Sequence, residues 1–206
     1  MAELLEINPD NPQERLLKKV VDSLQNGGVI IFPTDTIYGI GCALNQPKAI
    51  EKICKLKNIK PEKMNLSILC QDMSHISEYT KNISTPVFKV MKKLLPGPYT
   101  FILQSSGLVP KILGEKKKTI GIRIPDHALP HKIIEMLGCP LVSTSIKSDD
   151  EVLEYTTDPE EIFHEYQNTV DFVINAGYGG NIASTIIDCT SDIAVLVRQG
   201  LGVWED

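Results

Sequence analysis

A run of four consecutive apolar residues, Val29 to Phe32, constrains the fold more than any other feature of this chain. Gly27 and Gly28 precede this short run and Pro33 follows it, so it is predicted to be a strand bounded by turns. A strand without a polar position is typical of sheets that are covered on both faces. The run therefore predicts a layered α/β structure.

Helical and strand signals alternate along the rest of the chain, with no internal repeat and no long linker, so residues 1–206 are predicted to form a single mixed α/β domain. Helices are predicted to begin at Asn11-Pro12, Pro47, Thr85-Pro86, His131 and Asp158-Pro159. Strands are predicted at 29–32, 67–70, 99–104, 119–124, 141–142, 171–174, 185–188 and 193–197.

Composition is that of an ordinary globular protein, since 42% of the 206 residues are hydrophobic and 23% are charged. No apolar run approaches the roughly 18 residues that span a bilayer. The first ten residues are acidic and mixed, whereas a signal peptide is basic and then apolar. We therefore expect a cytoplasmic protein with no membrane partner.

The cysteines form no CxxC pair and are odd in number: Cys42, Cys54, Cys70, Cys139 and Cys189. Their spacing excludes a zinc ribbon or a thioredoxin-type pair, and their apolar neighbours suggest buried, reduced thiols. His127 and His131 stand four apart beside Asp126, but Pro130 interrupts the spacing, so no metal site is expected.

Charge is strongly segregated, although the net charge is only −5. Residues 1–47 carry three basic and six acidic side chains, residues 48–132 sixteen and six, and residues 133–206 two and fourteen, which gives −3, +10 and −12. If the central segment gathers on one face it suits a polyanion; otherwise its lysines are dispersed over solvated helix faces. The lysines that share one helical face are Lys48, Lys52 and Lys55.

Polar residues lie at the ends of several predicted strands, where open α/β sheets place ligands. Strand 29–32 runs into Pro33-Thr34-Asp35-Thr36 and then Tyr38-Gly39-Ile40-Gly41, which fits neither a dinucleotide nor a Walker loop. Ser143-Thr144-Ser145 and Ser184-Thr185 flank other strands, and their hydroxyls suit carboxylates and phosphates. Hydroxyls also cap ordinary turns, so a structural role stays open for each cluster.

Arginine is rare, with three residues against eighteen lysines, and two of the three end apolar strands. A guanidinium at such a position needs an anion, because an unpaired buried charge is costly. For Arg123 we favour an anion-binding role, with a salt bridge, for example to Asp188, as the alternative.

Seven segments carry a resemblance: FPTDTIYGIG at 32–41, KLK at 55–57, PGPYTFIL at 96–103, GIRIPDH at 121–127, STS at 143–145, STIID at 184–188 and VRQG at 197–200. In this order they resemble the YrdC-like family of threonylcarbamoyl-AMP synthases, over nearly the whole chain. The length and the variants look closest to the YciO branch of that family.

The resemblance implies an open, twisted mixed sheet with flanking helices and a basic concave face. It also implies a cavity for ATP, which enters with Mg²⁺, and for L-threonine and bicarbonate. Threonine and bicarbonate give a carbamate, which attacks the α-phosphate and expels pyrophosphate, and the adenylate then serves tRNA modification. This chemistry needs charge neutralisation and alignment more than a protein nucleophile.

By similarity, the residues expected to be catalytic are Lys55, Lys57 and Arg123, the two lysines at nucleotide phosphates and the arginine at the carboxylate or carbamate. The residues expected to bind substrate or nucleotide are Thr34, Thr36, Tyr38, Asn65, Cys70, Ser143, Ser145, Ser184 and Arg198. Asn65 ends a longer proline-containing turn, and Cys70 stands where the family often has histidine.

Other departures from the family pattern lie in the same segments. The Lys-x-Arg motif reads Lys55-Leu56-Lys57, which loses a bidentate fork for phosphate. The Ser-Ala-Asn motif reads Ser145-Ile146-Lys147. Three functions remain open: an enzyme that forms or acts on an adenylate, a non-catalytic protein that binds tRNA or double-stranded RNA, and a ligand-binding regulatory module.

Overall fold

The computed structural model describes residues 1–60, 65–110, 113, 118–146 and 156–205. Its helices are α1 (Glu14–Gln25), α2 (Pro47–Leu56), α3 (Met73–Tyr79), α4 (Thr85–Leu94), α5 (Ala128–Leu137) and α6 (Pro159–Tyr166). Its strands are β1 (Glu3–Glu6), β2 (Ile30–Phe32), β3 (Gly39–Ala43), β4 (Ser67–Leu69), β5 (Tyr99–Gln104), β6 (Thr119–Arg123), β7 (Leu141–Ser145), β8 (Phe172–Asn175), β9 (Thr185–Asp188) and β10 (Val195–Arg198).

The strands of this described part form one open, mixed sheet of ten strands in the order β1-β8-β2-β3-β7-β4-β6-β5-β9-β10. Parallel pairs join β8 to β1 and β2, β4 to β6, and β5 to β9, and the other neighbours are antiparallel. The sheet mixes segments from the whole chain, since β2 contacts β8 and β5 contacts β9. The open mixed α/β sheet predicted from the sequence is confirmed.

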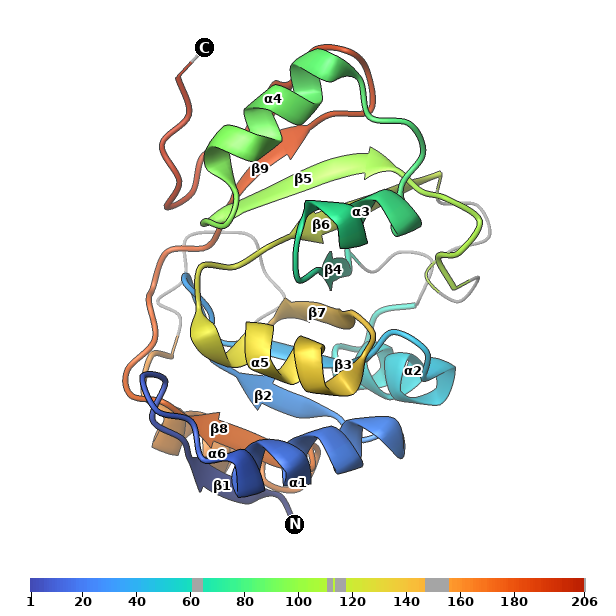
Figure 1. Ribbon diagram of the computed structural model, residues 1–206. Helices are drawn as coiled ribbons and strands as arrows, with labels where there is room; N and C mark the ends of the chain where they lie inside the picture. The colour runs from blue at the N-terminus through green and yellow to red at the C-terminus, as the bar shows by residue number, and fades with distance from the viewer. Residues whose placement is uncertain (61–64, 111–112, 114–117, 147–155, 206) are drawn as a thin grey trace.

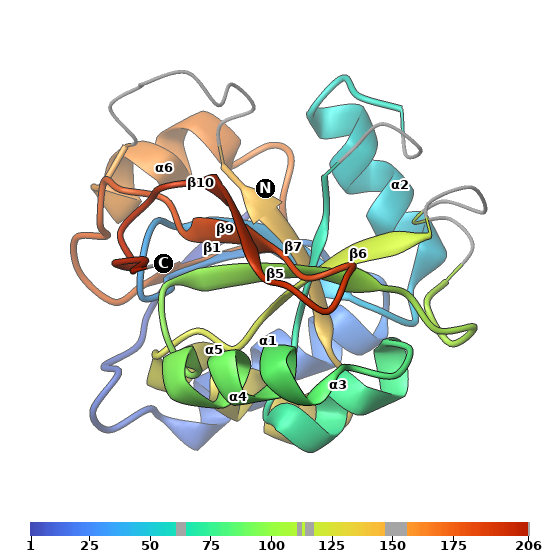
Figure 2. The ribbon, with the colours of Figure 1, turned by 90° about the horizontal axis from the view of Figure 1, so that it is seen from above.

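Two hydrophobic clusters fix the helices to the sheet. The first joins α1 and α5 to β2, β8 and one end of β4 and β7, through side chains such as Leu17 and Ile133. The second joins α2, α3 and α4 to the opposite face, through Ile53, Ile76 and Met91. Because the sheet twists strongly, α1, α3, α4 and α5 lie on one side of the molecule and α2 and α6 on the other (Figures 1 and 2).

Several predicted elements differ from the observed ones. The segment after Phe32, predicted to be a glycine-containing loop, turns back as β3 and pairs antiparallel with β2. The helix predicted from His131 begins at Ala128, because Pro130 lies in its first turn, where a missing amide hydrogen is tolerated. The prediction missed β1 and α3 altogether.

The cysteines are free thiols, four of them buried and Cys139 half-buried. Among the described residues, no helix combines the length and apolar character that a membrane crossing requires.

Candidate functional site

A row of small residues crosses four neighbouring strands, and its members Ser143, Ser67 and Gly121 form the floor of the candidate site. Gly41 on β3 lies opposite Ser143 on β7, and Ser143 lies opposite Ser67 on β4. Ser67 in turn lies opposite Gly121 on β6. Residues at matching positions point to one face of the sheet, and a Cβ placed on Gly121 would lie 2.7 Å from Ser67 Oγ.

The adjacent row on the same face explains why the floor is hollow. Ala43, Leu141 and Leu69 occupy this row and pack into the cluster under α1 and α5. On β6 the row continues with Arg123, which lies opposite Leu69. This face of the sheet is therefore covered where its residues are apolar, and it forms a depression where its residues are glycine and serine.

The depression belongs to a cavity of about 630 Å³, a size typical of small-molecule sites. Strands β3 to β7 and β9 and β10 all contribute to its wall, together with the segments that flank β4. The predicted site residues that line it are Thr34, Lys57, Tyr38, Asn65, Arg123, Ser143, Ser145, Ser184 and Arg198. Those that do not are Lys55, Thr36 and Cys70.

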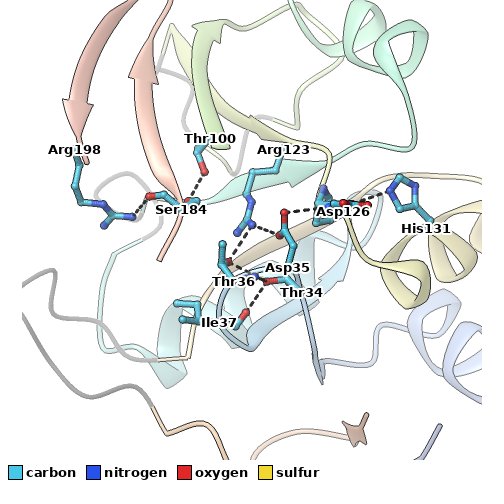
Figure 3. Close-up of polar contacts among 11 residues, drawn as sticks. Thr34, Asp35, Thr36, Ile37, Thr100, Arg123, Asp126, His131, Ser184 and Arg198 are labelled. Carbon is cyan, nitrogen blue, oxygen red and sulfur yellow. Dashed lines mark hydrogen bonds and ion pairs between the residues drawn. The ribbon is translucent and has the colours of Figure 1, made fainter. Parts of the chain in front are cut away.

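The loop after β2 holds Thr34 in a closed set of hydrogen bonds (Figure 3). Thr34 Oγ1 donates to the carbonyl of Ile37 at 2.7 Å and accepts the amide of Thr36 at 3.1 Å. Thr36 Oγ1 lies 3.1 Å away, and because the single proton of Thr34 is already used, Thr36 is the donor. The hydroxyl of Thr34 thus faces the cavity with its bonds satisfied inside the loop.

Arg123 is paired with Asp35, not with the Asp188 suggested by the sequence (Figure 3). Its Nη2 donates to Asp35 Oδ1 at 2.8 Å and to Thr36 Oγ1 at 3.1 Å, and the amide of Asp126 donates to Asp35 Oδ2 at 3.0 Å. The two side chains are only 11% and 7% exposed. From the sequence, anion binding and a structural salt bridge were alternative roles for Arg123. In the structure, the salt bridge itself lies in the cavity wall.

The electrostatics of Arg123 reflect this burial. Burial lowers the pKa of the guanidinium, and the facing Asp35 carboxylate raises it. Nε of Arg123 has no hydrogen-bond partner within the described part of the chain. The ion pair therefore fixes the guanidinium through Nη2 without satisfying all of its donors.

A second polar group lies at the β9–β10 end of the cavity. Ser184 Oγ and Thr100 Oγ1 are 2.8 Å apart, and both residues are buried. Arg198 Nη2 donates to the carbonyl oxygen of Ser184 at 3.0 Å. Strands β5 and β10 and the residue just before β9 therefore hold one arginine and two hydroxyls together (Figure 3).

Lys57 directly follows α2 and brings a third cation to the cavity wall. The side chain is half-buried, and this desolvation lowers its pKa to about 8, against the opposing effect of the Glu165 carboxylate. Lys55, two residues earlier on the helix, is exposed and points elsewhere. Side chains two positions apart on a helix do not face each other, so the two lysines expected by similarity to meet the phosphates together lie apart.

Two other predicted residues serve the scaffold. Cys70 is fully buried in the core, where burial raises the pKa of its thiol to about 12, and its amide donates to the carbonyl of Arg123 at 2.9 Å. Tyr38 touches the cavity, but its hydroxyl donates to the carbonyl of Gly177 at 2.7 Å, and burial raises its pKa to about 12.

The histidines near Asp126 are engaged by the backbone. His131 Nε2 lies 2.8 Å from the carbonyl oxygen of Pro125, and His127 Nδ1 accepts the amide of Leu129 at 3.2 Å. Within residues 1–60, 65–110, 113, 118–146 and 156–205, no three His, Cys, Asp or Glu side chains form a metal-binding group.

Sequence reasoning missed Ser67, Thr100 and Gly121, which also line the cavity. A usable signal was present, because Gly39, Gly41, Gly121 and Ser67 replace apolar residues at alternate positions of otherwise apolar strands. Such positions mark places where a ligand or another backbone approaches closely.

Comparisons with known proteins give consistent results. A family model described as telomere recombination, which groups Sua5, YciO and YrdC, matches residues 22–200. Uncharacterized protein YciO from Escherichia coli K12 is 40% identical over 204 residues, 98% of this chain and 97% of that protein. The crystal structure of E. coli YciO matches with a TM-score of 0.90 and 39% identity over 98% of both chains.

Two further relatives carry more specific names. A putative threonylcarbamoyl-AMP synthase from Methanocaldococcus jannaschii is 35% identical over 205 residues, 96% of this chain and 93% of that protein. P. abyssi Sua5, crystallised with L-threonine, matches with a TM-score of 0.86 at 23% identity, over 97% of this chain and 58% of that one, which shows a shared fold. With the ordered motifs, the ten-stranded sheet and the family match, these findings show that the chain belongs to the Sua5/YciO/YrdC family.

Proposed function

We propose that this protein forms or processes threonylcarbamoyl-AMP, or a similar acyl-adenylate, in the metabolism of tRNA threonylcarbamoyladenosine. One observation carries the proposal: a single cavity gathers Lys57, Arg123 and Arg198 with hydroxyls from strands distant in sequence. A purely structural role gives these groups no reason to converge, whereas a ligand with phosphate and carboxylate groups needs several donors. The identity to a putative threonylcarbamoyl-AMP synthase supports the same chemistry.

Each cation has a proposed role. ATP, bound as its Mg²⁺ complex, places its phosphates near Lys57 and Arg198, and Arg123 and Ser184 hold the carboxylate or carbamate of threonine. The amine of threonine and bicarbonate condense to the carbamate with loss of water. A carbamate oxygen then attacks the α-phosphorus and forms a new P–O bond, while the bond from that phosphorus to the bridging oxygen breaks and its electron pair leaves with pyrophosphate. The protein contributes alignment and charge neutralisation, because it presents cations and hydroxyls at the site.

A direct assay tests this proposal. The purified protein is incubated with ATP, Mg²⁺, L-threonine and bicarbonate, and pyrophosphate and threonylcarbamoyl-AMP are quantified by mass spectrometry. Product formation supports synthesis; turnover of supplied threonylcarbamoyl-AMP without synthesis supports a processing role. If neither occurs and ATP does not bind, the proposal fails. Arg198→Gln should reduce the signal, and Lys132→Gln, an exposed change on α5, serves as the matched control.

Binding to tRNA or double-stranded RNA is the second candidate, favoured by the +10 charge of residues 48–132. Phosphate contacts release counterions, so affinity for RNA should fall steeply between about 50 and 200 mM salt. A flat salt response would reject binding through the RNA backbone.

A further inference from the structure

We propose that the hydroxyls of Ser67 and Ser143 form a paired platform for a planar, CO₂-type oxyanion. This oxyanion is either the carboxylate of threonine or the hydrogencarbonate ion. The inference rests on the proposed function and names the subsite at which this group is held. Ser67 thereby becomes a specificity-determining residue of the cavity.

The position of the two serines is the first observation. Ser67 on β4 and Ser143 on β7 lie directly opposite each other in an antiparallel pair and both line the cavity. The Cβ atoms of such a pair are about 4.5–5.5 Å apart. Serine hydroxyls so placed can bond to each other, but neither of these has a hydrogen-bond partner among the described residues. Both hydroxyls therefore remain for a ligand.

The neighbours of the pair keep it accessible. On one side, a Cβ on Gly121 would lie 2.7 Å from Ser67 Oγ and 3.3 Å from a Thr100 methyl. On the other side, a Cβ on Gly41 would lie 3.2 Å from Ser143 Cβ. Gly121 lines the cavity, so its missing side chain leaves the space beside Ser67 open, whereas Gly41 is covered by the Phe32 ring and closes the other end of the row. An alanine at Gly121 or at Gly41 would crowd the neighbouring serine.

The chemistry of the platform suits a planar oxyanion. A hydroxyl donates one hydrogen bond and accepts others, so a pair can donate to two oxygens of a carboxylate and can also accept the proton of hydrogencarbonate. Arg123 comes from the next row on β6 and, although it is paired with Asp35, presents its guanidinium in the same cavity wall. A neutral pair beside one cation fits a singly charged group better than a polyphosphate, which needs several cations.

A series of polar residues connects the platform to the second arginine. Four strand steps lead from β4 through β6, β5 and β9 to β10, which carries Arg198. Between them, the Thr100 methyl lies 3.3 Å from where a Gly121 Cβ would be, the Thr100 hydroxyl lies 2.8 Å from that of Ser184, and Arg198 donates to the carbonyl of Ser184. One elongated ligand, with a CO₂-type group at one end and a nucleotide at the other, can contact both places.

Three variants test the platform. Ser67→Ala removes one hydroxyl, and Gly121→Ala crowds it by adding a methyl group. Ser77→Ala is the matched control, since Ser77 is exposed on α3 and its hydroxyl donates to the carbonyl of Met73. Calorimetry measures Kd for ATP–Mg²⁺ and for L-threonine, and ¹³C NMR line broadening measures binding of labelled hydrogencarbonate.

We expect Ser67→Ala and Gly121→Ala to weaken hydrogencarbonate or threonine about three- to tenfold, the loss expected for one neutral hydrogen bond. The affinity for ATP–Mg²⁺ should stay within about twofold, and Ser77→Ala should match the unaltered protein. The ligand that weakens identifies the group that the platform holds. Unchanged binding of both, or an equal loss for ATP, overturns the platform while the proposed function stands. Failure of the unaltered protein to bind ATP overturns the proposed function instead.

Discussion

At the scale of single residues, Lys57 is the cation whose charge is most sensitive to pH near neutrality. The arginines of the cavity stay protonated at all physiological pH values, whereas burial lowers the pKa of Lys57 to about 8. The ammonium is therefore charged below pH 8 and becomes neutral above it. A lysine at this position makes the charge of the cavity depend on pH in a way that an arginine would not.

The first prediction follows from this charge. Affinity for ATP–Mg²⁺ should fall as pH rises from 7 to 9, by up to about tenfold per unit above the pKa. Lys57→Arg should keep its affinity over this range, because a guanidinium remains charged. Calorimetric titrations at pH 7, 8 and 9 measure both proteins. Parallel pH profiles for the two would contradict a role for the Lys57 charge.

The second prediction concerns the buried pair of Asp35 and Arg123. Asp35→Ala leaves a guanidinium buried without its partner, which should destabilise the fold by about 3–5 kcal/mol in urea unfolding. Arg123→Ala should cost less, because the amide of Asp126 still donates to the carboxylate. The double variant should lose less than the sum of the two single losses. Strict additivity would show that the two side chains do not stabilise each other.

At the scale of the elements, glycines occupy two kinds of position, one packed against a neighbouring strand and one at the end of a helix. A Cβ on Gly41 would lie 2.5 Å from the carbonyl oxygen of Val142 and 3.0 Å from the Phe32 ring. Gly138 ends α5 in the left-handed region at φ 71°, with open space around its missing Cβ. A side chain added at Gly41 would therefore force neighbouring elements apart, whereas one added at Gly138 would not.

The third prediction uses this contrast. Gly41→Ala should destabilise the protein by more than about 2 kcal/mol, because β3 and β7 must separate or Phe32 must move. Gly138→Ala should cost only about 1 kcal/mol, the conformational penalty at a helix end. Urea unfolding of both variants measures the difference. Equal costs would mean that the contact between β3 and β7 relaxes freely.

Short apolar runs and proline starts made most elements predictable. The strand at Ile30–Phe32 and the helix from Pro47 were found because their patterns are local. The strand Gly39–Ala43 was missed because glycines resemble a turn, and only pairing with β2 and β7 makes them a strand. The charged β1, ELLE, depends likewise on its parallel partner β8.

The candidate site was predictable to the extent that strand ends carry unusual polar residues. Arg123, Ser143 and Ser184 were found in this way, and the structure brings them to one cavity. The Asp35 partner and the facing position of Ser67 depend on strand order and register, which join segments distant in sequence. No local pattern contains that information.

At the scale of the whole molecule, the two edges of the sheet differ from its centre. The centre, β7, β4 and β6, is paired on both sides and mostly buried. The edge strand β10 pairs with β9 alone and exposes Val195 and Val197 by 54% and 57%. Local opening should therefore begin at this edge.

The fourth prediction is a gradient of hydrogen exchange. Amides of β7 and β6 should exchange only by global unfolding, while those of β10 should exchange by local opening at much faster rates. ATP–Mg²⁺ should slow exchange in β10, because Arg198 and Val197 line the cavity. Hydrogen exchange with mass spectrometry reports both effects. Protection of β10 equal to that of β6 would show that the edge is not a separate opening unit.

The glycine and serine row has a consequence for how this cavity can change. Its floor is nearly bare backbone, held by the hydrogen bonds between strands. Substitution can add atoms there but can remove almost none, so variation along the row can only make the cavity shallower. Any shift towards a bulkier ligand must therefore come from the larger side chains of the walls, such as Ile102 and Ile186, or from the surrounding loops, and we expect laboratory evolution for larger substrates to leave Gly121 unchanged.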